Sequence, residues 1–425
     1  MVKKILNRTK NNFDTFYTES RRSFASLLLK ALYIGTVGYG GPAMIAMIKQ
    51  LIVKEKGIIN EKEFIDGLGL SQLLPGATGV NLIGYIGYKK NKLWGIVLLP
   101  TMFVLPSFIS INLFSWLYFT YGNLPFVKTI FQGLGALVVA LLINALFSIG
   151  SSLFIKYPAK EFYKYFKEII IAAGAFLTLF LFKVNVLWII ISTGIAGILL
   201  FYLSKENFKI EKYQIDLRRL SRLGFKREKK KNIFRYYFPL ATLISFMLIT
   251  AFYFPNGLLI VQSFTQFGSI TFGGGFVAIP LLKDLVVDQY GWLTLEQFRD
   301  GIAMGQITPG PVLITAAFIG YKLGGIVGSL ISTMAIFAPS MIGIMFLSKV
   351  HDKVQSFDWV KALMRGFLAG FIGMLVSVTV QFGIHSLISV PAWLIFAFSI
   401  FYLMYLKKPT IWLILSVFVI SLIIF

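Results

Sequence analysis

Gly35-Thr-Val-Gly-Tyr-Gly-Gly-Pro42 is the most informative stretch of the chain, because a similar stretch, Gly268-Ser-Ile-Thr-Phe-Gly-Gly-Gly275, occurs in the second half. Other pairs follow in the same order at an offset of 233 to 234 residues: 71–77 with 305–311, 87–89 with 320–322, 105–107 with 338–340, and 132–136 with 365–369. A nearly constant offset over about 100 residues does not arise by chance. The chain is therefore expected to contain two copies of one ancestral unit.

The composition indicates a membrane protein. Of the 425 residues, 57% are hydrophobic and 14% are charged, and the mean hydropathy is +0.77. Apolar stretches recur from residue 26 onward, each near the roughly 20 residues that cross a bilayer as a helix. They lack the period-two alternation of β-barrel strands. We expect an all-α polytopic membrane protein with about thirteen transmembrane segments, among them residues 64–88 and 298–321.

Charge predicts the orientation of these segments. Residues 1–22 are basic and lack the features of a secretory signal, so a cytoplasmic amino terminus is expected. The linker 204–236 holds twelve Lys or Arg and four acids, as cytoplasmic loops do. Lys89 falls inside with its neighbours Lys90 and Lys92, and the carboxyl terminus falls outside. The loop with Lys54, Lys56 and Lys62 fits the positive-inside rule less well, because it would lie outside.

An odd number of segments has a consequence for the two copies. Four parts are expected: a first repeat (1–203), the basic linker (204–236), a linking transmembrane helix (237–254) and a second repeat (255–425). The linking helix makes the second repeat start from the opposite side of the membrane, so the repeats are inverted. Inverted repeats place a binding site near the bilayer midplane, which is typical of transporters.

The repeated motifs indicate where that site lies. Glycine and proline disfavour helix in these apolar segments, so we expect broken helices at two motifs in each half. The residues are Gly40, Gly41, Pro42, Pro75, Gly76, Gly273, Gly274, Gly275, Pro309, Gly310 and Pro311. Half-helices that begin after the breaks would direct free N–H groups at an anion. The alternative is close helix packing through small residues, which four repeated motifs make the weaker interpretation.

These motifs resemble those of the chromate ion transporters, whose two-domain members carry a Phe-Gly-Gly and a Pro-Gly-Pro motif in each half. Phe272-Gly-Gly-Gly275 and Thr308-Pro-Gly-Pro311 are similar to the second-half pair, and Tyr39-Gly-Gly-Pro42 and Leu74-Pro-Gly-Ala77 to the first. The resemblance implies secondary active transport of an oxyanion, namely proton-driven chromate efflux with sulfate as a mimic. Tyr39, Ala77 and Ile45 depart from the family pattern, which indicates an altered first-half site.

Ionisable groups in the membrane are functional candidates. Arg365 lies opposite Gln132 in the repeat and would suit a tetrahedral oxyanion, or it would snorkel to the interface. Asp66 and Asp300 occupy matching positions and are candidates for the coupling proton. Lys49 and Lys283 also match. They would pair with these acids or, as the favoured alternative, be solvated helix ends.

Neutral polar side chains complete the predicted substrate site. Gln72, Asn81, Gln306 and Thr315 would bind oxyanion oxygens without the desolvation cost of a fixed charge, or they would join helices by hydrogen bonds.

Metal, cofactor and nucleic-acid sites are not expected. The chain has no cysteine, and its two histidines, His351 and His385, are far apart in sequence. The basic linker is interpreted as a topology determinant that contacts anionic lipids, not nucleic acid. The partners expected are a small inorganic oxyanion and membrane lipids. A homodimer is compatible with the sequence.

Three functional classes follow from the sequence. A proton-coupled oxyanion transporter is favoured by the inverted repeats and broken helices. An anion channel or uniporter, or a transporter of another small anion, would use the same architecture. An enzyme would need a convergent set of carboxylates, histidines or a nucleophile with its base, which the sequence does not offer.

Overall fold

The computed structural model describes residues 24–39, 41–54, 58–154, 165–203, 233–272, 274–354, 358–406 and 409–425. Residues 1–22 and most of the basic linker, on which the orientation was predicted, lie outside these ranges. The first half begins with the helix Phe24–Val37. It continues with α2 (Gly41–Lys49), the π-helix η1 (Gln50–Lys54), α3 (Glu61–Leu73), α4 (Thr78–Tyr121), α5 (Pro125–Phe154), α6 (Phe166–Phe180), α7 (Val186–Gly197) and the π-helix η3 (Ile198–Tyr202).

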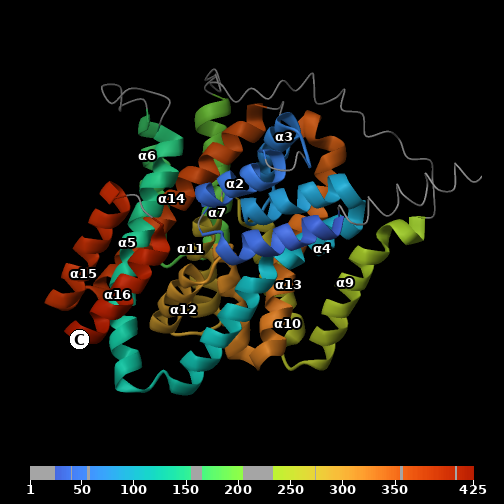
Figure 1. The fold of residues 1–425 in the computed structure, drawn as a ribbon. Helices are drawn as coiled ribbons and strands as arrows, with labels where there is room; N and C mark the ends of the chain where they lie inside the picture. Colours follow the sequence, from blue (N-terminus) through green and yellow to red (C-terminus); the bar gives the residue numbers. More distant parts are fainter. Residues whose placement is uncertain are drawn as a thin grey trace, which may run out of the picture.

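The second half follows the same order. After the linking helix α9 (Ile233–Tyr253), its elements are α10 (Gly257–Ile270), the 3₁₀ turn η4 (Gly275–Val277), α11 (Ala278–Lys283), the π-helix η5 (Asp284–Gln289), α12 (Leu295–Ile307), the 3₁₀ turn η6 (Val312–Ile314), α13 (Thr315–Val354), α14 (Asp358–Ser386), α15 (Val390–Phe401), the π-helix η7 (Tyr402–Leu406) and α16 (Thr410–Ile424). Throughout the described ranges the fold is all-α, as predicted (Figure 1).

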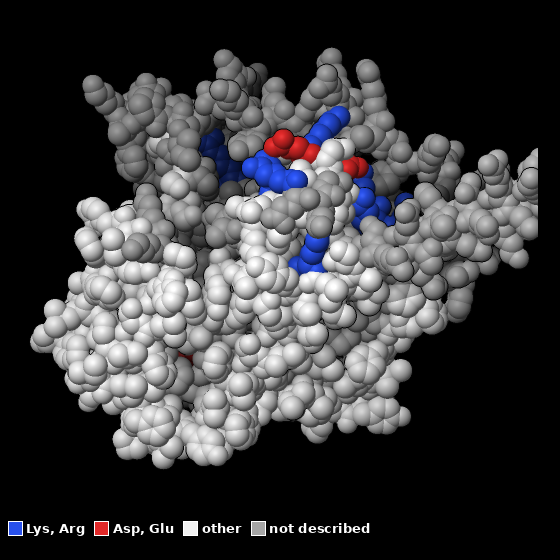
Figure 2. Space-filling view, viewed as in Figure 1, with Lys and Arg blue, Asp and Glu red and all other residues white. Residues whose placement is uncertain are grey.

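The outer surface is that of a membrane protein. Four helices in the described part of the chain are long and apolar enough to cross a bilayer, and shorter apolar helices accompany them. Large apolar side chains stand on the outer faces of helices: Trp188, Phe252 and Ile423 are 67%, 71% and 77% exposed. On the face shown in Figure 2, charged side chains gather over the upper part, and the lower part is nearly all uncharged. Such a surface fits lipid rather than water.

Residues 64–88 do not form the single crossing that was predicted. α3 and the first arm of α4 (residues 78–90) fold against each other as a hairpin. Lys89 Nζ lies 3.5 Å from Glu63 Oε1, and the amide nitrogen of Asn81 donates to the Ser71 carbonyl oxygen over 3.2 Å. A continuous helix of this length would separate its ends by more than 30 Å. The hairpin therefore brings the start of α3 and the end of the first α4 arm to the same end of the molecule.

Residues 298–321 form the equivalent hairpin in the second half. A Cβ at Gly301 of α12 would overlap the ring of Phe318 in α13, as a Cβ at Gly67 of α3 would overlap the ring of Tyr85. The four positions correspond at the repeat offset. Two of the thirteen predicted segments, residues 64–88 and 298–321, are therefore hairpins and not single helices.

A kink follows each hairpin at the same position of the repeat. α4 leaves helical geometry at Asn91 and Lys92, and α13 does so at Gly324 and Gly325. The φ angle is 48° at Lys92 and 57° at Gly325, a region that costs little for glycine but strains lysine. After the kinks, residues 93–121 and 326–354 run on as long second arms.

The two sets of hairpins approach each other end to end. In Figure 1, α2 and α3 lie in the upper part of the molecule, α10 and α12 lie in the lower part, and α4 and α13 pass between the two levels. α13 packs against α4, α9 and α10, while α14 packs against α5, α6 and α7. The broken ends of the helices are thereby brought to the middle of the fold.

Candidate functional site

The interrupted helices of each half meet the hairpin tip of the other half. The N–H of Gly310 donates to the carbonyl oxygen of Gly38 (N···O 2.8 Å), and the N–H of Gly76 donates to that of Thr271 (2.7 Å). The repeat offset converts one hydrogen bond into the other. Tyr39 and Gly310 add a parallel β-bridge. The four broken segments predicted from the motifs therefore come together at one place, which we call the crossing of the two halves, and both halves contribute equally.

The hairpin tips need glycine for their backbone conformation. The φ angles are +97° at Gly76 and +115° at Gly310, values that side-chain-bearing residues rarely adopt. Ser107 donates its hydroxyl hydrogen to the Pro309 carbonyl oxygen, and a Cβ on Gly310 would overlap that hydroxyl. In the other half Ser340 packs beside Gly76. The repeated Pro-Ser pairs of the sequence thus hold the tips from the long second arms.

The helix starts at this centre lack side-chain caps. Ala77, Gly274 and Pro311 precede α4, η4 and η6, and none makes a side-chain hydrogen bond to the helix that follows. By contrast, α3 and α12 begin with complete capping boxes, built on Asn60 and Thr294. The first N–H groups of a helix have no intrahelical partner. The first N–H groups of these helix starts therefore have no side-chain acceptor at the capping position.

Most predicted backbone residues lie at this crossing. Gly274, Gly275, Pro309, Gly310 and Pro311 occupy it in the second half, with Pro75 and Gly76 opposite. α2 begins at Gly41 and Pro42 directly after the first break. Gly40 and Gly273 lie outside the described residues.

The neutral polar candidates differ in their surroundings. Asn81 is fully buried and donates to the Ser71 and Pro75 carbonyl oxygens over 3.2 and 3.0 Å, so it fastens the hairpin tip. Thr315 donates to the Val312 carbonyl oxygen over 2.9 Å. Gln72 is exposed. The buried amide nitrogen of Gln306 has no hydrogen-bond acceptor among the described residues, which leaves it available to a ligand.

A buried charged network surrounds Asp300. Arg299 Nη2 lies 2.9 Å and Nε 3.0 Å from Asp300 Oδ1, and the Tyr118 hydroxyl donates to Oδ2 over 2.9 Å. Arg299 also donates to Ser386 Oγ over 3.1 Å and packs over Gly135. The repeat-related Asp66 is buried as well, at 6% exposure. The two aspartates were predicted from the sequence, but Arg299 was not. Its position within an apolar segment was the signal that could have indicated it.

The repeated lysines pair with acids other than Asp66 and Asp300. Lys49 Nζ lies 2.6 Å from Glu61 Oε1, and Lys283 Nζ lies 2.7 Å from Asp288 Oδ2. The hydrogen bond and charge of Lys49 hold the pKa of the Glu61 carboxyl below its usual range. Lys283 is 7% exposed, so its interpretation as a solvated helix end was wrong.

Arg365 lies in an ion pair between helices. Its guanidinium contacts the carboxylate of Glu168, which is fully buried in α6, and stacks 4.4 Å above the ring of Phe201. Lys167 beside it donates to the Leu200 carbonyl oxygen over 2.8 Å. These contacts fix α14 against α6 and η3, and the sequence held no pattern that paired Glu168 with Arg365.

Within the part of the chain that the structure describes, no three His, Asp or Glu side chains cluster in a way that could hold a metal ion. His385 is exposed, and its Nδ1 lies 2.8 Å from the Gln381 carbonyl oxygen. The side chain of His351 is not among those described.

Comparison with known proteins identifies the family. The family model described as chromate transporter matches residues 25–198 and 258–422, one match in each half. The chain belongs to the chromate transporter family. It is accordingly a multi-pass membrane transport protein and not an enzyme. The two matched ranges each contain one broken helix and one hairpin.

Three relatives match most of the length of this chain. An uncharacterized transporter of Methanocaldococcus jannaschii is 30% identical over 411 residues, 95% of this chain and 94% of the relative. The chromate transport protein of Cupriavidus metallidurans is 26% identical over 92% of this chain and 90% of its own, and that of Pseudomonas aeruginosa is 28% identical over 84% and 81%. No solved structure shows detectable similarity.

Proposed function

We propose that this chromate transporter family member is a secondary active transporter of a small inorganic oxyanion, chromate or sulfate, and that it works by proton-coupled efflux across the cell membrane. The observation that carries the proposal is the reciprocal joining of Gly38 to Gly310 and of Thr271 to Gly76. It brings uncapped helix starts from both halves to one place. Relatives that are named as chromate transport proteins support the substrate class.

The proposed topology has inverted repeats with four re-entrant elements. Helix Phe24–Val37 with α2, and α3 with the first arm of α4, enter from the cytoplasm. α10 with α11, and α12 with the first arm of α13, enter from outside. Trp292 after η5 stacks on Phe264 of α10, with ring centroids 6.3 Å apart, which supports a return to the outer side. Nine crossings remain: the second arms of α4 and α13, and α5, α6, α7, α9, α14, α15 and α16.

This topology accounts for the loop that the thirteen-crossing prediction did not. Lys54, Lys56 and Lys62 join Lys89 and its basic neighbours on the cytoplasmic side, in line with the positive-inside rule. The amino terminus stays cytoplasmic and the carboxyl terminus stays outside, because each half loses two crossings.

The proposed anion site lies among the helix starts. Irregular backbone at membrane depth is tolerated only in protein or beside water, and partial positive charge at helix N-termini favours an oxyanion. Gln306 would add its unbonded amide nitrogen, and Thr315 would donate to the anion the hydroxyl hydrogen that it now gives to the Val312 carbonyl oxygen. Asp300 and Asp66, buried in matching positions, are the proposed carriers of the coupling proton. Rocking one set of hairpins against the other would expose the site alternately to each side.

The test is transport by purified protein in proteoliposomes. Labelled chromate and sulfate are supplied with and without an imposed pH gradient. Saturable accumulation that requires the gradient is the expected result. A channel or uniporter would instead give flux that follows the electrochemical gradient of the anion alone, and absence of flux for both anions in folded protein would overturn the proposal.

A further inference from the structure

A polar cavity lies to one side of the crossing, between α6, α11 with η5, and α14. Its volume is about 310 Å³, room for roughly ten water molecules. Leu179, Phe180, Val287 and Leu295 supply apolar wall. The polar lining consists of Lys183, Lys283, Asp284, Asp288 and Gln381. Of these residues, only Lys283 was singled out from the sequence.

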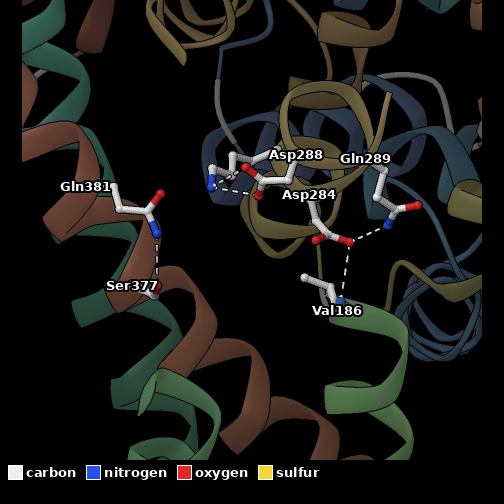
Figure 3. Close-up of polar contacts among 7 residues, drawn as sticks. Val186, Asp284, Asp288, Gln289, Ser377 and Gln381 are labelled. Atoms are coloured by element: carbon white, nitrogen blue, oxygen red, sulfur yellow. Dashed lines mark hydrogen bonds and ion pairs between the residues drawn. The ribbon is translucent and has the colours of Figure 1, made fainter. Parts of the chain in front are cut away.

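The two aspartates of the cavity have different roles. Asp284 accepts hydrogen bonds from Gln289 (2.6 Å) and from the Val186 N–H at the start of α7 (3.3 Å), so it joins η5 to α7 (Figure 3). Asp288 binds the Lys283 ammonium through both oxygens, at 2.7 and 2.9 Å. The contact of Asp284 with Gln289 and that of Lys283 with Asp288 each join residues five positions apart, the spacing of the backbone hydrogen bonds in a π-helix such as η5. The π-helix thereby places a carboxylate on the buried lysine.

The ion pair of Lys283 and Asp288 is asymmetric in exposure. The Lys283 side chain is 9% exposed, whereas that of Asp288 is 39% exposed. A lysine so buried needs a counter-ion. The aspartate can move into water and the lysine cannot. Asp288 is therefore the replaceable member of the pair.

Two further groups on the cavity wall have capacity to bind. Lys183 lies in the turn between α6 and α7 with φ +49° and has no ion pair or hydrogen bond with another described residue. Gln381 on α14 lies across the cavity from Asp288 (Figure 3), and its amide donates only a long 3.3 Å hydrogen bond to Ser377 Oγ. Together they provide one more positive charge and a neutral donor.

We propose that this cavity is a second oxyanion site, in which the anion replaces the Asp288 carboxylate on Lys283 and is also bound by Lys183 and Gln381. This inference rests on the proposed function. A carboxylate held through two oxygens presents the same pair of acceptors as one edge of a tetrahedral oxyanion. Once Asp288 has moved away, two lysines face the cavity, and Asp284 keeps its own donors.

The position of Lys283 connects this second site to the crossing. From Gly275 at the break, η4 and α11 lead directly to Lys283, about 12 Å along the helix axis. In the proposed topology this cavity opens on the outer side, so an anion bound there lies on the path between the crossing and the exterior.

The test uses substitutions with opposite expected effects. Lys283→Gln removes the central charge and should raise the KM for sulfate and chromate about tenfold, while Asp288→Asn removes the competing carboxylate and should lower it several-fold. Lys183→Gln should raise the KM about threefold. A merely structural ion pair would give the same direction for Lys283→Gln and Asp288→Asn. The matched control is Lys361→Gln, which breaks a 2.7 Å pair with Asp358 at the other end of α14 and should leave the KM unchanged.

Transport in proteoliposomes and the unfolding temperature are measured for each variant. If Lys283→Gln does not fold, Asp288→Asn and Lys183→Gln still decide the question. Wild-type flux with unchanged KM in Asp288→Asn and Lys183→Gln would overturn the second site and leave the proposed function standing. Absence of wild-type flux for both anions would overturn both.

Discussion

The backbone N–H of Gly310 donates to the carbonyl oxygen of Gly38 over 2.8 Å, although 272 residues of sequence separate them. The related bond from Gly76 to Thr271 makes the contact reciprocal. Each half thus holds the broken helix of the other, and neither half completes the crossing alone. Movement of one half must strain or break both hydrogen bonds together, which couples the two hairpin tips.

Alanine at the hairpin tips should damage the second half more than the first. Gly310→Ala meets both an unfavourable φ of +115° and the Ser107 hydroxyl, whereas Gly76→Ala meets a φ of +97° and a Ser340 Cβ 3.3 Å away. Backbone strain alone costs about 1–3 kcal/mol. Thermal unfolding should show the larger loss for Gly310→Ala. Ser107→Ala in that background should recover part of the loss, and equal losses for the two alanine variants would contradict this account.

The sequence predicted the repeat, the broken helices and the acids better than it predicted topology. Glycine and proline act locally, so their effects on Gly76 or Gly310 were readable from the motifs. Whether residues 64–88 cross the membrane or fold back depends on contacts between α3 and α4, such as the packing of Gly67 on Tyr85, which hydropathy does not encode. The partners of charged side chains were missed for the same reason: Glu168 and Arg365 are distant in sequence, and only packing brings them together.

Lys92→Gly should stabilise the protein. Lys92 has φ 48° at the kink of α4, where the equivalent residue of α13 is Gly325. Glycine relieves the strain, and the expected gain is about 1 kcal/mol, reduced slightly by loss of the contact between Lys92 and the Tyr88 ring. Lys90→Gly is the matched control, because Lys90 is an exposed helical residue and glycine there should cost about 1 kcal/mol. Equal destabilisation of both variants would show that the kink is not strained.

Neutralising Asp300 should separate transport from proton coupling. Asp300→Asn alone leaves Arg299 buried without its carboxylate, and we expect a loss of about 3–5 kcal/mol in stability. Arg299→Gln with Asp300→Asn removes both charges and should recover much of that loss. In proteoliposomes the double variant should retain anion counterflow and lose accumulation driven by a pH gradient. Tyr118→Phe, which removes only the 2.9 Å hydrogen bond, should keep the gradient response. Gradient-driven accumulation by the double variant would exclude Asp300 as a required proton carrier.

Arg365→Gln makes the second half match Gln132 of the first. The variant tests whether Arg365 stabilises the helix packing or binds the anion. Its contacts with Glu168 and Phe201 predict a loss of about 3–5 kcal/mol in stability, because a fully buried carboxylate loses its counter-ion. Glu168→Gln added to this variant should restore most of the stability. The KM for the anion should stay unchanged in the double variant. A raised KM there would instead support Arg365 as the anion ligand predicted from the sequence.

Cysteine labelling should distinguish nine crossings from thirteen. The chain has no native cysteine, so single cysteines can be introduced without altering the background. Lys62, Lys90, Asn123 and Ile388 are exposed positions in loops or at helix ends. With a membrane-impermeant maleimide, cysteines at 123 and 388 should be labelled in intact cells. Cysteines at 62 and 90 should react only after the membrane is permeabilised.

The cysteines at positions 62 and 90 distinguish the two topologies. Thirteen crossings place these residues on opposite sides of the membrane, whereas the hairpin closed by Glu63 and Lys89 places them on the same side. Labelling of Lys62→Cys in intact cells, with Lys90→Cys protected, would therefore require the hairpin to open into a crossing helix. Because residues 62 and 90 flank the same tip, their common protection would also place the Gly76 turn within a re-entrant element that starts and ends in the cytoplasm.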